Sequence, residues 1–402
     1  MAKRIVITGL GTVSAFGLTT QKFWSSLIAG QSAIRPLPPL FDKVKVSIGA
    51  LVQDFDASSH FTADEISLFD RFSTYAVLAA EEAIADAGLI ANSEIITNAA
   101  AIIGSGVGGK NTDEVTYTQL YRDNRSRLHP LTIPRTMLSA AASSVSRHLG
   151  VKGAVFSVAS ACASGAHAIS QGAMMIQSGN TDVAIVGGTD APFAYAVLKA
   201  WDALRVISTD NCRPFCNTRS GTVLGEGAGM LVLESEEHAV KRGARIYAEL
   251  AGSGMTSDAG HITRPDVEGM SQAMIKALIH ANITADQVDY INAHGTGTPA
   301  NDSAETEAIH MAFGSHANKL AVSSTKSMHG HALGASSAME IVATVLALQN
   351  NIIPPTINYI ERDDKCDLDY VPNKAREQKL DVAISNSFAF GGLNAAVVLK
   401  SY

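Results

Sequence analysis

The sequence predicts an α/β fold in which a sheet is covered on both faces by helices. Short apolar strands alternate with helices of small and apolar residues along all 402 residues, and several strands are apolar at every position. Such continuous runs are typical of strands buried on both faces. Hydrophobic residues make up 46% of the chain and charged residues 17%, a composition that suits a compact globular protein rather than a disordered one.

The predicted elements form two successive series. The first series comprises strand 4–8, helix 73–87, strand 99–104, strand 154–158, a helix after residue 162, and strands 182–187 and 227–234. The second series comprises strand 246–251, helix 270–282, strand 288–292, helix 302–313, strand 320–324, helix 334–349, and strands 380–385 and 395–399. No linker rich in proline or serine separates the series, so we expect a duplicated core with halves at 1–245 and 246–402. Longer irregular segments are expected at 31–62, 105–136, 204–224 and 254–269.

Charge and cysteine content exclude several classes of function. The net charge of -7 and the absence of a long basic block argue against nucleic-acid binding. No stretch approaches the roughly 20 apolar residues of a membrane span. The four cysteines are too few and too scattered for a disulfide framework, which favours a reducing cytoplasmic location.

Cys162 lies where the apolar strand 154–158 passes through a turn of small residues into a helix. The macrodipole and the free N–H groups at a helix start favour a thiolate, and small neighbours leave room for a substrate. The alternative is a buried structural cysteine. The setting predicts a nucleophile of low pKa, which iodoacetamide should label near neutral pH faster than it labels Cys366.

His294 follows a predicted strand and opens a Gly-Thr-Gly-Thr turn, where a histidine is expected to face a cleft rather than only to cap the backbone. Thr296 and Thr298 in that turn either bind an amide-rich ligand or satisfy the turn itself.

A second histidine motif, at 326–331, stands between a strand and the glycine-rich start of a helix. His329 and His331 have the spacing of a chelating pair, but no third ligand is close in sequence, so acid–base or oxyanion chemistry is favoured over a metal site. The segment 386–394 joins two strands, and its glycines allow the backbone to approach a ligand with an N–H group. The alternative for that segment is a turn with two core aromatics.

Taken together, these motifs resemble the β-ketoacyl-acyl carrier protein synthases of types I and II. The resemblance rests on Ser-Ala-Cys-Ala-Ser-Gly around Cys162, Asn-Ala-His-Gly-Thr-Gly-Thr around His294, the segment 326–331 and Phe-Gly-Gly-Leu-Asn at 390–394. It extends over essentially the whole chain and keeps the order of the motifs. It implies a five-layered αβαβα thiolase-type fold and a homodimer, or a heterodimer with a related subunit.

The resemblance implies decarboxylative Claisen condensation. Cys162 would take an acyl group from acyl carrier protein, and a malonyl thioester on the same carrier would then lose CO2 and attack the Cys162 thioester. His294 and His331 would stabilise the enolate oxygen, and the N–H groups of Cys162 and Phe390 would form the oxyanion hole. No redox cofactor or catalytic metal is implied, because the phosphopantetheine arm arrives on the carrier.

The resemblance also assigns supporting residues. Lys326, paired with Glu305, would organise the histidines. The arm and the acyl chain would be held by Thr296, Thr298, Phe388, Gly391 and the gate residue Phe390. A structural cation site found in some members of the family corresponds to Asn292, Glu340, Ser385 and Asn386. Because the carrier is acidic, candidate docking residues are Arg71, Arg125, Arg127, Lys199 and Arg205, each of which is otherwise read as a solvated surface charge.

The chain departs from the usual pattern of the family. His329 stands where most members have Thr, Cys216 where they have Asp, and Thr222 where they have Phe, and the segment 110–113 is polar. The His-x-His motif and Asp190-Ala-Pro are similar to those of nodulation-type condensing enzymes. Housekeeping fatty-acid elongation and a specialised polyene, polyketide or nodulation product therefore remain alternatives.

Three other classes are disfavoured. A thiolase would need a second catalytic cysteine near the C-terminus, and a type III synthase would pair its cysteine with His and Asn. A non-catalytic chain-length partner would lack the nucleophile, whereas Cys162 is present.

Overall fold

The computed structural model describes residues 3–41, 43–53 and 55–402, so residues 42 and 54 of the predicted irregular segment 31–62 lie outside the described residues. Ten strands form one mixed sheet in the order β10-β9-β13-β14-β8-β1-β7-β6-β4-β5. The strands of its first half are β1 (Ile5–Val13), β4 (Ala100–Gly104), β5 (Val155–Val158), β6 (Val183–Asp190) and β7 (Gly227–Ser235). Those of its second half are β8 (Ala248–Ser257), β9 (Tyr290–Asn292), β10 (Ala321–Ser323), β13 (Val382–Ala389) and β14 (Leu393–Ser401).

The two halves repeat one topology. In the first half, β4 pairs in parallel with β5 and β6, and β7 pairs antiparallel with both β6 and β1. In the second half, β9 pairs in parallel with β10 and β13, and β14 pairs antiparallel with both β13 and β8. The halves meet where β1 pairs with β8 through Val6 and Ile7. The repeated order agrees with the duplicated core expected from the sequence.

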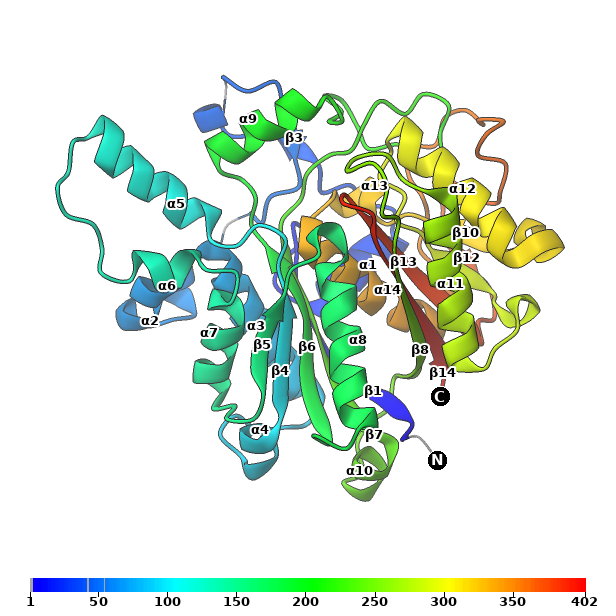
Figure 1. The fold of residues 1–402 in the computed structure, drawn as a ribbon, viewed down its shortest axis with the longest axis horizontal. Helices are drawn as coiled ribbons and strands as arrows, with labels where there is room; N and C mark the ends of the chain where they lie inside the picture. The colour runs from blue at the N-terminus through cyan, green and yellow to red at the C-terminus, as the bar shows by residue number, and fades with distance from the viewer. Residues whose placement is uncertain (1–2, 42, 54) are drawn as a thin grey trace.

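Helices cover both faces of each half-sheet, as the apolar strands predict. The helices α3 (Arg71–Asp86) and α7 (Ala140–Leu149) pack outside the first half-sheet, and α11 (Val267–Ala281) and α12 (Pro299–Phe313) lie outside the second. Two helices, α8 (Ser164–Gln177) and α14 (Ser336–Asn350), lie between the half-sheets and contact each other (Figure 1). Every residue of α14 from Ser336 to Leu348 is buried.

The segment 105–136, expected to be irregular, is largely helical. It contains α5 (Lys110–Tyr117), the π-helix η3 (Thr118–Arg122) and α6 (Thr132–Thr136), which project from the body (Figure 1). The apolar side chains of Val115, Tyr117 and Tyr121 are exposed, so the segment lacks the buried apolar face by which a helix is recognised in a sequence. The expected strand 246–251 likewise continues as β8 to Ser257, which shortens the predicted loop 254–269.

Shorter elements complete the chain. The remaining helices are α1 (Thr20–Ile28), α2 (Ala63–Leu68), α4 (Glu94–Asn98), α9 (Tyr195–Leu204), α10 (Glu236–Lys241) and α13 (Lys326–His329). Two small antiparallel sheets pair β2 (Arg35–Pro36) with β3 (Ile48–Gly49) and β11 (Ile352–Ile353) with β12 (Arg376–Glu377). Among the described residues, none of the helices has the length and apolar character needed to cross a bilayer.

Candidate active site

Cys162 lies in the tight turn η4 (Ala161–Ala163) between β5 and α8. Ala161 has a φ of 49°, a left-handed conformation that a residue with a Cβ adopts only under strain. Gly165 then allows α8 to approach α14, because a Cβ there would lie 2.8 Å from Oγ of Ser337. The small residues around Cys162 therefore bring the thiol to the junction of the two halves.

His294 and His331 come from the second half. His294 follows β9, and its backbone N–H donates to Glu305 at 2.8 Å. Gly330 precedes His331 with a φ of 69°, and a Cβ there would lie 2.9 Å from the carbonyl oxygen of Leu224. The N–H of His331 donates to the carbonyl of Val223 at 2.7 Å. Glycine at 330 is thus required for the turn that aims His331 at the cysteine.

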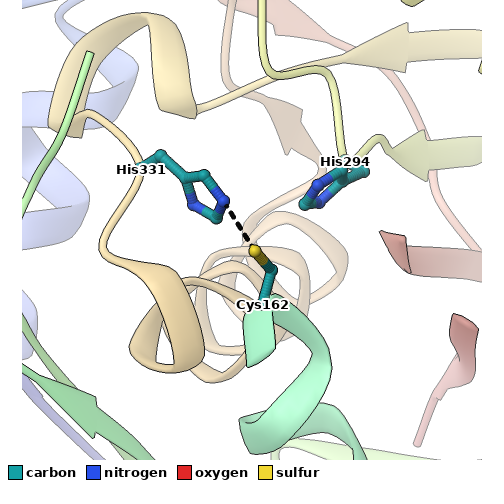
Figure 2. Close-up of side chains that lie close together, drawn as sticks. All are labelled: Cys162, His294 and His331. Atoms are coloured by element: carbon teal, nitrogen blue, oxygen red, sulfur yellow. Dashed lines mark hydrogen bonds between the residues drawn. The ribbon is translucent and has the colours of Figure 1, made fainter. Parts of the chain in front are cut away.

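The structure brings Cys162, His294 and His331 together (Figure 2). Nε2 of His331 lies 3.1 Å from Sγ of Cys162, and the two imidazole rings have centroids 5.4 Å apart at 85°. One ligand atom from each of the three side chains lies within 4.8 Å of the others, a donor set that suits zinc. The ammonium of Lys326, 3.4 Å from Nδ1 of His294, disfavours a divalent cation there.

His329 does not join this cluster. Its Nε2 lies 3.0 Å from Oγ1 of Thr325, and its ring packs against Phe23. The i, i+2 spacing of His329 and His331 therefore does not produce a chelating pair.

The expected low pKa of Cys162 is wrong for the resting site. Burial, with a smaller contribution from nearby Asp190, raises the pKa of the Cys162 thiol to about 12. The charge of Lys326 and the N–H groups of Phe390 and Cys162 act in the opposite direction. Cys162 does lie at a helix start as predicted, but the loss of hydration on burial raises its pKa by more than the helix start lowers it. The resting thiol is therefore protonated.

Both site histidines are neutral. Burial, the charge of Lys326 and the facing His331 hold the pKa of His294 well below its usual range. Burial and Lys326 do the same for the pKa of His331, with a smaller contribution from His329. A neutral imidazole carries one N–H and one acceptor nitrogen, so each ring has a single donor.

Lys326 is not paired with Glu305 as expected. Its ammonium forms an ion pair with Glu340 and donates to the backbone carbonyl of His294 at 2.7 Å. Glu305 instead accepts the N–H groups of His294 and Gly295, each at 2.8 Å. Glu340 is thus the ionic partner of Lys326, and Glu305 fixes the turn that carries His294.

A cavity of about 300 Å³ leads to Cys162 and both site histidines. Of the predicted substrate-binding residues, the cavity is lined by Thr296, Thr298, Phe388 and Phe390. Gly391, which was also expected to bind substrate, does not line the cavity: it is exposed, and its N–H donates to the carbonyl of Ile262 at 2.7 Å. Gly392 lines the cavity in its place. The rings of Phe390 and Trp201 stack with centroids 6.0 Å apart, so Trp201 is a wall residue that its position in the sequence did not indicate.

Asp190 is a second residue whose role the sequence did not indicate. Its buried carboxylate accepts the Ser105 hydroxyl at 2.7 Å and the N–H groups of Gly106, Val107 and Gly334 at 2.8, 3.1 and 2.7 Å. It therefore ties the loop after β4 to the loop after His331. Only the fold brings these donors together, because Gly334 lies 144 residues along the chain.

The four residues of the expected cation site share one property. Asn292 Oδ1, Glu340 Oε2, Ser385 Oγ and Asn386 Oδ1 are buried and lack a hydrogen-bond partner within the described chain. Oxygen ligands of this kind suit a hard cation. The residues therefore fit the group that the resemblance implies.

The candidate docking residues are placed differently from one another. Arg205 lines the cavity, and so does Arg264, which the sequence did not suggest. Arg125 and Arg127 are exposed. Arg71 donates to Glu226 at 2.8 Å and Lys199 donates to the backbone carbonyl of Lys43, so these two cations are already engaged.

Comparison with known proteins identifies the family. The model of the beta-ketoacyl synthase N-terminal domain matches residues 2–239, and that of the C-terminal domain matches residues 247–360. The chain belongs to the β-ketoacyl synthases, and it is accordingly a condensing enzyme of the acyltransferase class. This confirms the resemblance drawn from the motifs.

Similar proteins cover the whole chain. Nodulation protein E of Rhizobium sp. (strain N33) is 47% identical, with 100% of both chains covered. The 3-oxoacyl-[acyl-carrier-protein] synthase 2 of Coxiella burnetii (strain RSA 493 / Nine Mile phase I) is 44% identical, with 99% of this chain and 98% of that protein covered. The structure of the ishigamide ketosynthase/chain length factor superimposes with a TM-score of 0.94 at 34% identity, with 100% of both chains covered. The expected thiolase-type fold of ketosynthases is confirmed.

Proposed function

We propose that this enzyme condenses an acyl group held on Cys162 with a malonyl unit, both delivered as thioesters of acyl carrier protein. The observation that carries the proposal is the convergence of the Cys162 thiol, two neutral histidines and two backbone N–H groups at the inner end of one cavity. The printed name of the relative from Coxiella burnetii supports the carrier as substrate.

In the first half-reaction, Sγ of Cys162 attacks the acyl thioester. A new C–S bond forms, the bond to the sulfur of the phosphopantetheine arm breaks, and the thiol proton ends on that departing sulfur. The N–H groups of Cys162 and Phe390, which act to lower the pKa of the Cys162 thiol, would hold the oxyanion of the tetrahedral intermediate. Lys326 and the hydrogen bond with His331 would stabilise negative charge on sulfur as the proton leaves.

In the second half-reaction, the malonyl carboxylate leaves as CO2 and its electron pair forms an enolate. N–H groups on His294 and His331 would donate to the enolate oxygen, since both rings are neutral and face the cavity. The enolate carbon attacks the acyl carbonyl on Cys162, and the C–S bond then breaks. Sγ leaves as a thiolate and takes a proton from solvent.

Lys326 would fix the tautomer of His294. An ammonium only donates hydrogen bonds, and Lys326 lies 3.4 Å from Nδ1 of His294. Nδ1 is then the acceptor, and the proton is on Nε2, the nitrogen available to the substrate. Glu340 balances the buried charge of Lys326.

Thr296 and Thr298 would hold the phosphopantetheine arm, since both line the cavity and their hydroxyls lie 2.9 Å apart. Phe388 lies against the His294 ring, and Phe390 with Trp201 would gate the acyl chain.

Arg205 and Arg264 would attract the acidic carrier to the cavity. The arm belongs to the carrier, so the enzyme itself would need no dissociable cofactor. A structural cation held by Asn292, Glu340, Ser385 and Asn386 would neutralise buried oxygens without entering the reaction.

A dimer is supported by the free edge of the sheet. Within the described part of the chain, β5 pairs with β4 alone, and Phe156 on it is 38% exposed. Exposed apolar side chains also lie on the segment that projects from the body, at Val115, Tyr117, Tyr121, Ile133 and Met137. A strand with one unpaired edge, together with exposed apolar surface, favours a second subunit of the same fold, either another copy or a related chain. The cytoplasmic location is supported by the four cysteines, which are free thiols.

The test compares two cysteine variants with acyl and malonyl carrier protein as substrates. Cys162→Ala should abolish the β-ketoacyl product, whereas Cys366→Ala, at a buried cysteine outside the cavity, should retain it. Unchanged product formation by Cys162→Ala would refute the proposal. A panel of acyl donors of different length and unsaturation then separates housekeeping elongation from the specialised pathway suggested by the similarity to nodulation protein E.

A further inference from the structure

Ser336, the first residue of α14, contacts the ring of His331 but has no role in the proposed reaction. Its Oγ lies 2.9 Å from Nδ1 of His331, and it also accepts the backbone N–H of Ala332 at 2.8 Å. The side chain is 1% exposed, so water does not compete for these hydrogen bonds. Ser336 is the only side-chain partner of Nδ1 of His331 among the described residues.

The Ala332 contact orients the hydroxyl. A backbone N–H can only donate, so it occupies a lone pair of Oγ and leaves the hydroxyl proton available for a second partner. Nδ1 of the neutral His331 ring is the acceptor that lies within reach. The second lone pair of Oγ could still accept a hydrogen bond, but the described residues offer the hydroxyl proton no other acceptor, which favours a serine that donates to an unprotonated Nδ1.

The other ring nitrogen of His331 lies on the side of Cys162 and the cavity. Nε2 of His331 lies 3.1 Å from Sγ of Cys162, and His331 lines the cavity. A neutral imidazole protonated at Nε2 presents a donor there, as stabilisation of an enolate oxygen requires. His294 receives the equivalent support from Lys326.

We propose that Ser336 is a positioning residue that holds His331 as the Nε2-protonated tautomer. The inference rests on the proposed role of His331 as a donor to the enolate. The two histidines then differ in the group that contacts Nδ1: the ammonium of Lys326 contacts His294, and the hydroxyl of Ser336 contacts His331. The hydroxyl, unlike the ammonium, supports its histidine without bringing a net charge to the site.

The direct test is the tautomer itself. In protein with ¹⁵N-labelled histidine rings, the resonances of His331 are identified by their loss in His331→Ala. The wild-type enzyme should show a pyridine-type Nδ1 and a pyrrole-type Nε2 for His331. A pyrrole-type Nδ1 in the wild type would overturn the proposal, whatever the enzyme condenses. In Ser336→Ala, the fraction of His331 protonated at Nε2 should fall, and the tautomer protonated at Nδ1 should appear.

The kinetic test uses Ser336→Ala, Ser336→Thr and the control Ser144→Ala, which removes a buried hydroxyl whose hydrogen bond, among the residues described, goes to the carbonyl of Ala140 within α7. Ser336→Ala should lower decarboxylation of malonyl carrier protein about tenfold, because one donor to the enolate is weakened but not deleted. Ser336→Thr should recover part of that loss, and Ser144→Ala should match the wild type. Decarboxylation by Ser336→Ala within twofold of the wild type, or an equal loss in all three variants, would refute a positioning role. A wild type with the expected tautomer but no decarboxylation would instead refute the proposed function.

Discussion

At the scale of single residues, the resting state of Cys162 is set by competition between burial and nearby donors. Removal from water favours the neutral thiol, whereas Lys326 and two backbone N–H groups favour the thiolate. Burial prevails in the resting site, so the thiol is neutral there. The site is thus arranged to stabilise charge during the reaction rather than before it.

The raised pKa predicts how alkylation of Cys162 depends on pH. Because the pKa is raised to about 12, the thiolate fraction should rise about tenfold per pH unit from pH 7 to 9 without reaching a plateau. Iodoacetamide labelling of Cys162, measured by peptide mass spectrometry at each pH, checks this. A plateau that begins near pH 7 would show that the thiol is already ionised and contradict the account.

The buried pair of Lys326 and Glu340 predicts a separation of stability from activity. Lys326→Met should cost about 3–5 kcal/mol in the free energy of unfolding, because Glu340 is left without its partner. The double variant Lys326→Met/Glu340→Gln should recover most of that loss in urea unfolding, yet still fail to decarboxylate malonyl carrier protein. Recovery of decarboxylation in the double variant would show that Lys326 acts only through stability.

At the scale of the elements, His148 joins three helices. It lies on α7 and contacts Glu81 on α3 and Glu65 on α2. The hydrogen bond with Glu81, with smaller contributions from Glu65, raises the pKa of His148. Its stabilising contribution is therefore fully present below the unfolded-state pKa of about 6.5 and is lost as the pH rises through the folded-state value.

This pH dependence predicts the behaviour of His148→Ala. The variant should lose about 1 kcal/mol of unfolding free energy at pH 6 and clearly less at pH 9. Urea unfolding of the wild type and the variant at both values measures the difference. An equal loss at both values would mean that His148 stabilises the helices by packing against Phe61 rather than by charge.

The sequence allows the strands and the three central site residues to be predicted, for a physical reason. Cys162, His294 and His331 each follow an apolar strand or stand beside a glycine turn, and both signals are local. The Lys326–Glu340 pair, the Asp190 carboxylate and Ser336 depend on which loops the fold brings together, so no local pattern reveals them. The helical segment 110–122 was missed because its apolar side chains are not turned inward.

At the scale of the whole molecule, the duplicated architecture explains why the site contains residues from distant parts of the chain. The helices α8 and α14 lie between the half-sheets, and the nucleophile precedes one while His331 precedes the other. We propose that the two halves of the chain divide between residues 245 and 246, since that boundary falls between α10 and β8. One site is thus assembled from both repeats.

The free edge at β5 predicts the oligomeric state. Phe156→Arg should shift the protein from a dimer to a monomer in light scattering, because a charge would then lie on the edge strand where the second subunit pairs. Ile279→Arg, at an exposed apolar residue of α11 on the outside of the second half, should leave the dimer intact. A wild-type chain that is monomeric alone but dimeric with a related subunit would establish the heterodimer. A wild type that is monomeric with either would refute the proposed interface.

The most direct test of the central claim is the intact mass of the enzyme during one cycle. Mixed with acyl carrier protein bearing an acyl chain, the enzyme should gain the mass of that acyl group, localised to Cys162 by peptide mapping. Addition of malonyl carrier protein should remove the adduct and yield a β-ketoacyl carrier protein longer by two carbons, with release of CO2. An adduct on any other residue, or a Cys162 adduct that malonyl carrier protein does not extend, would contradict the account.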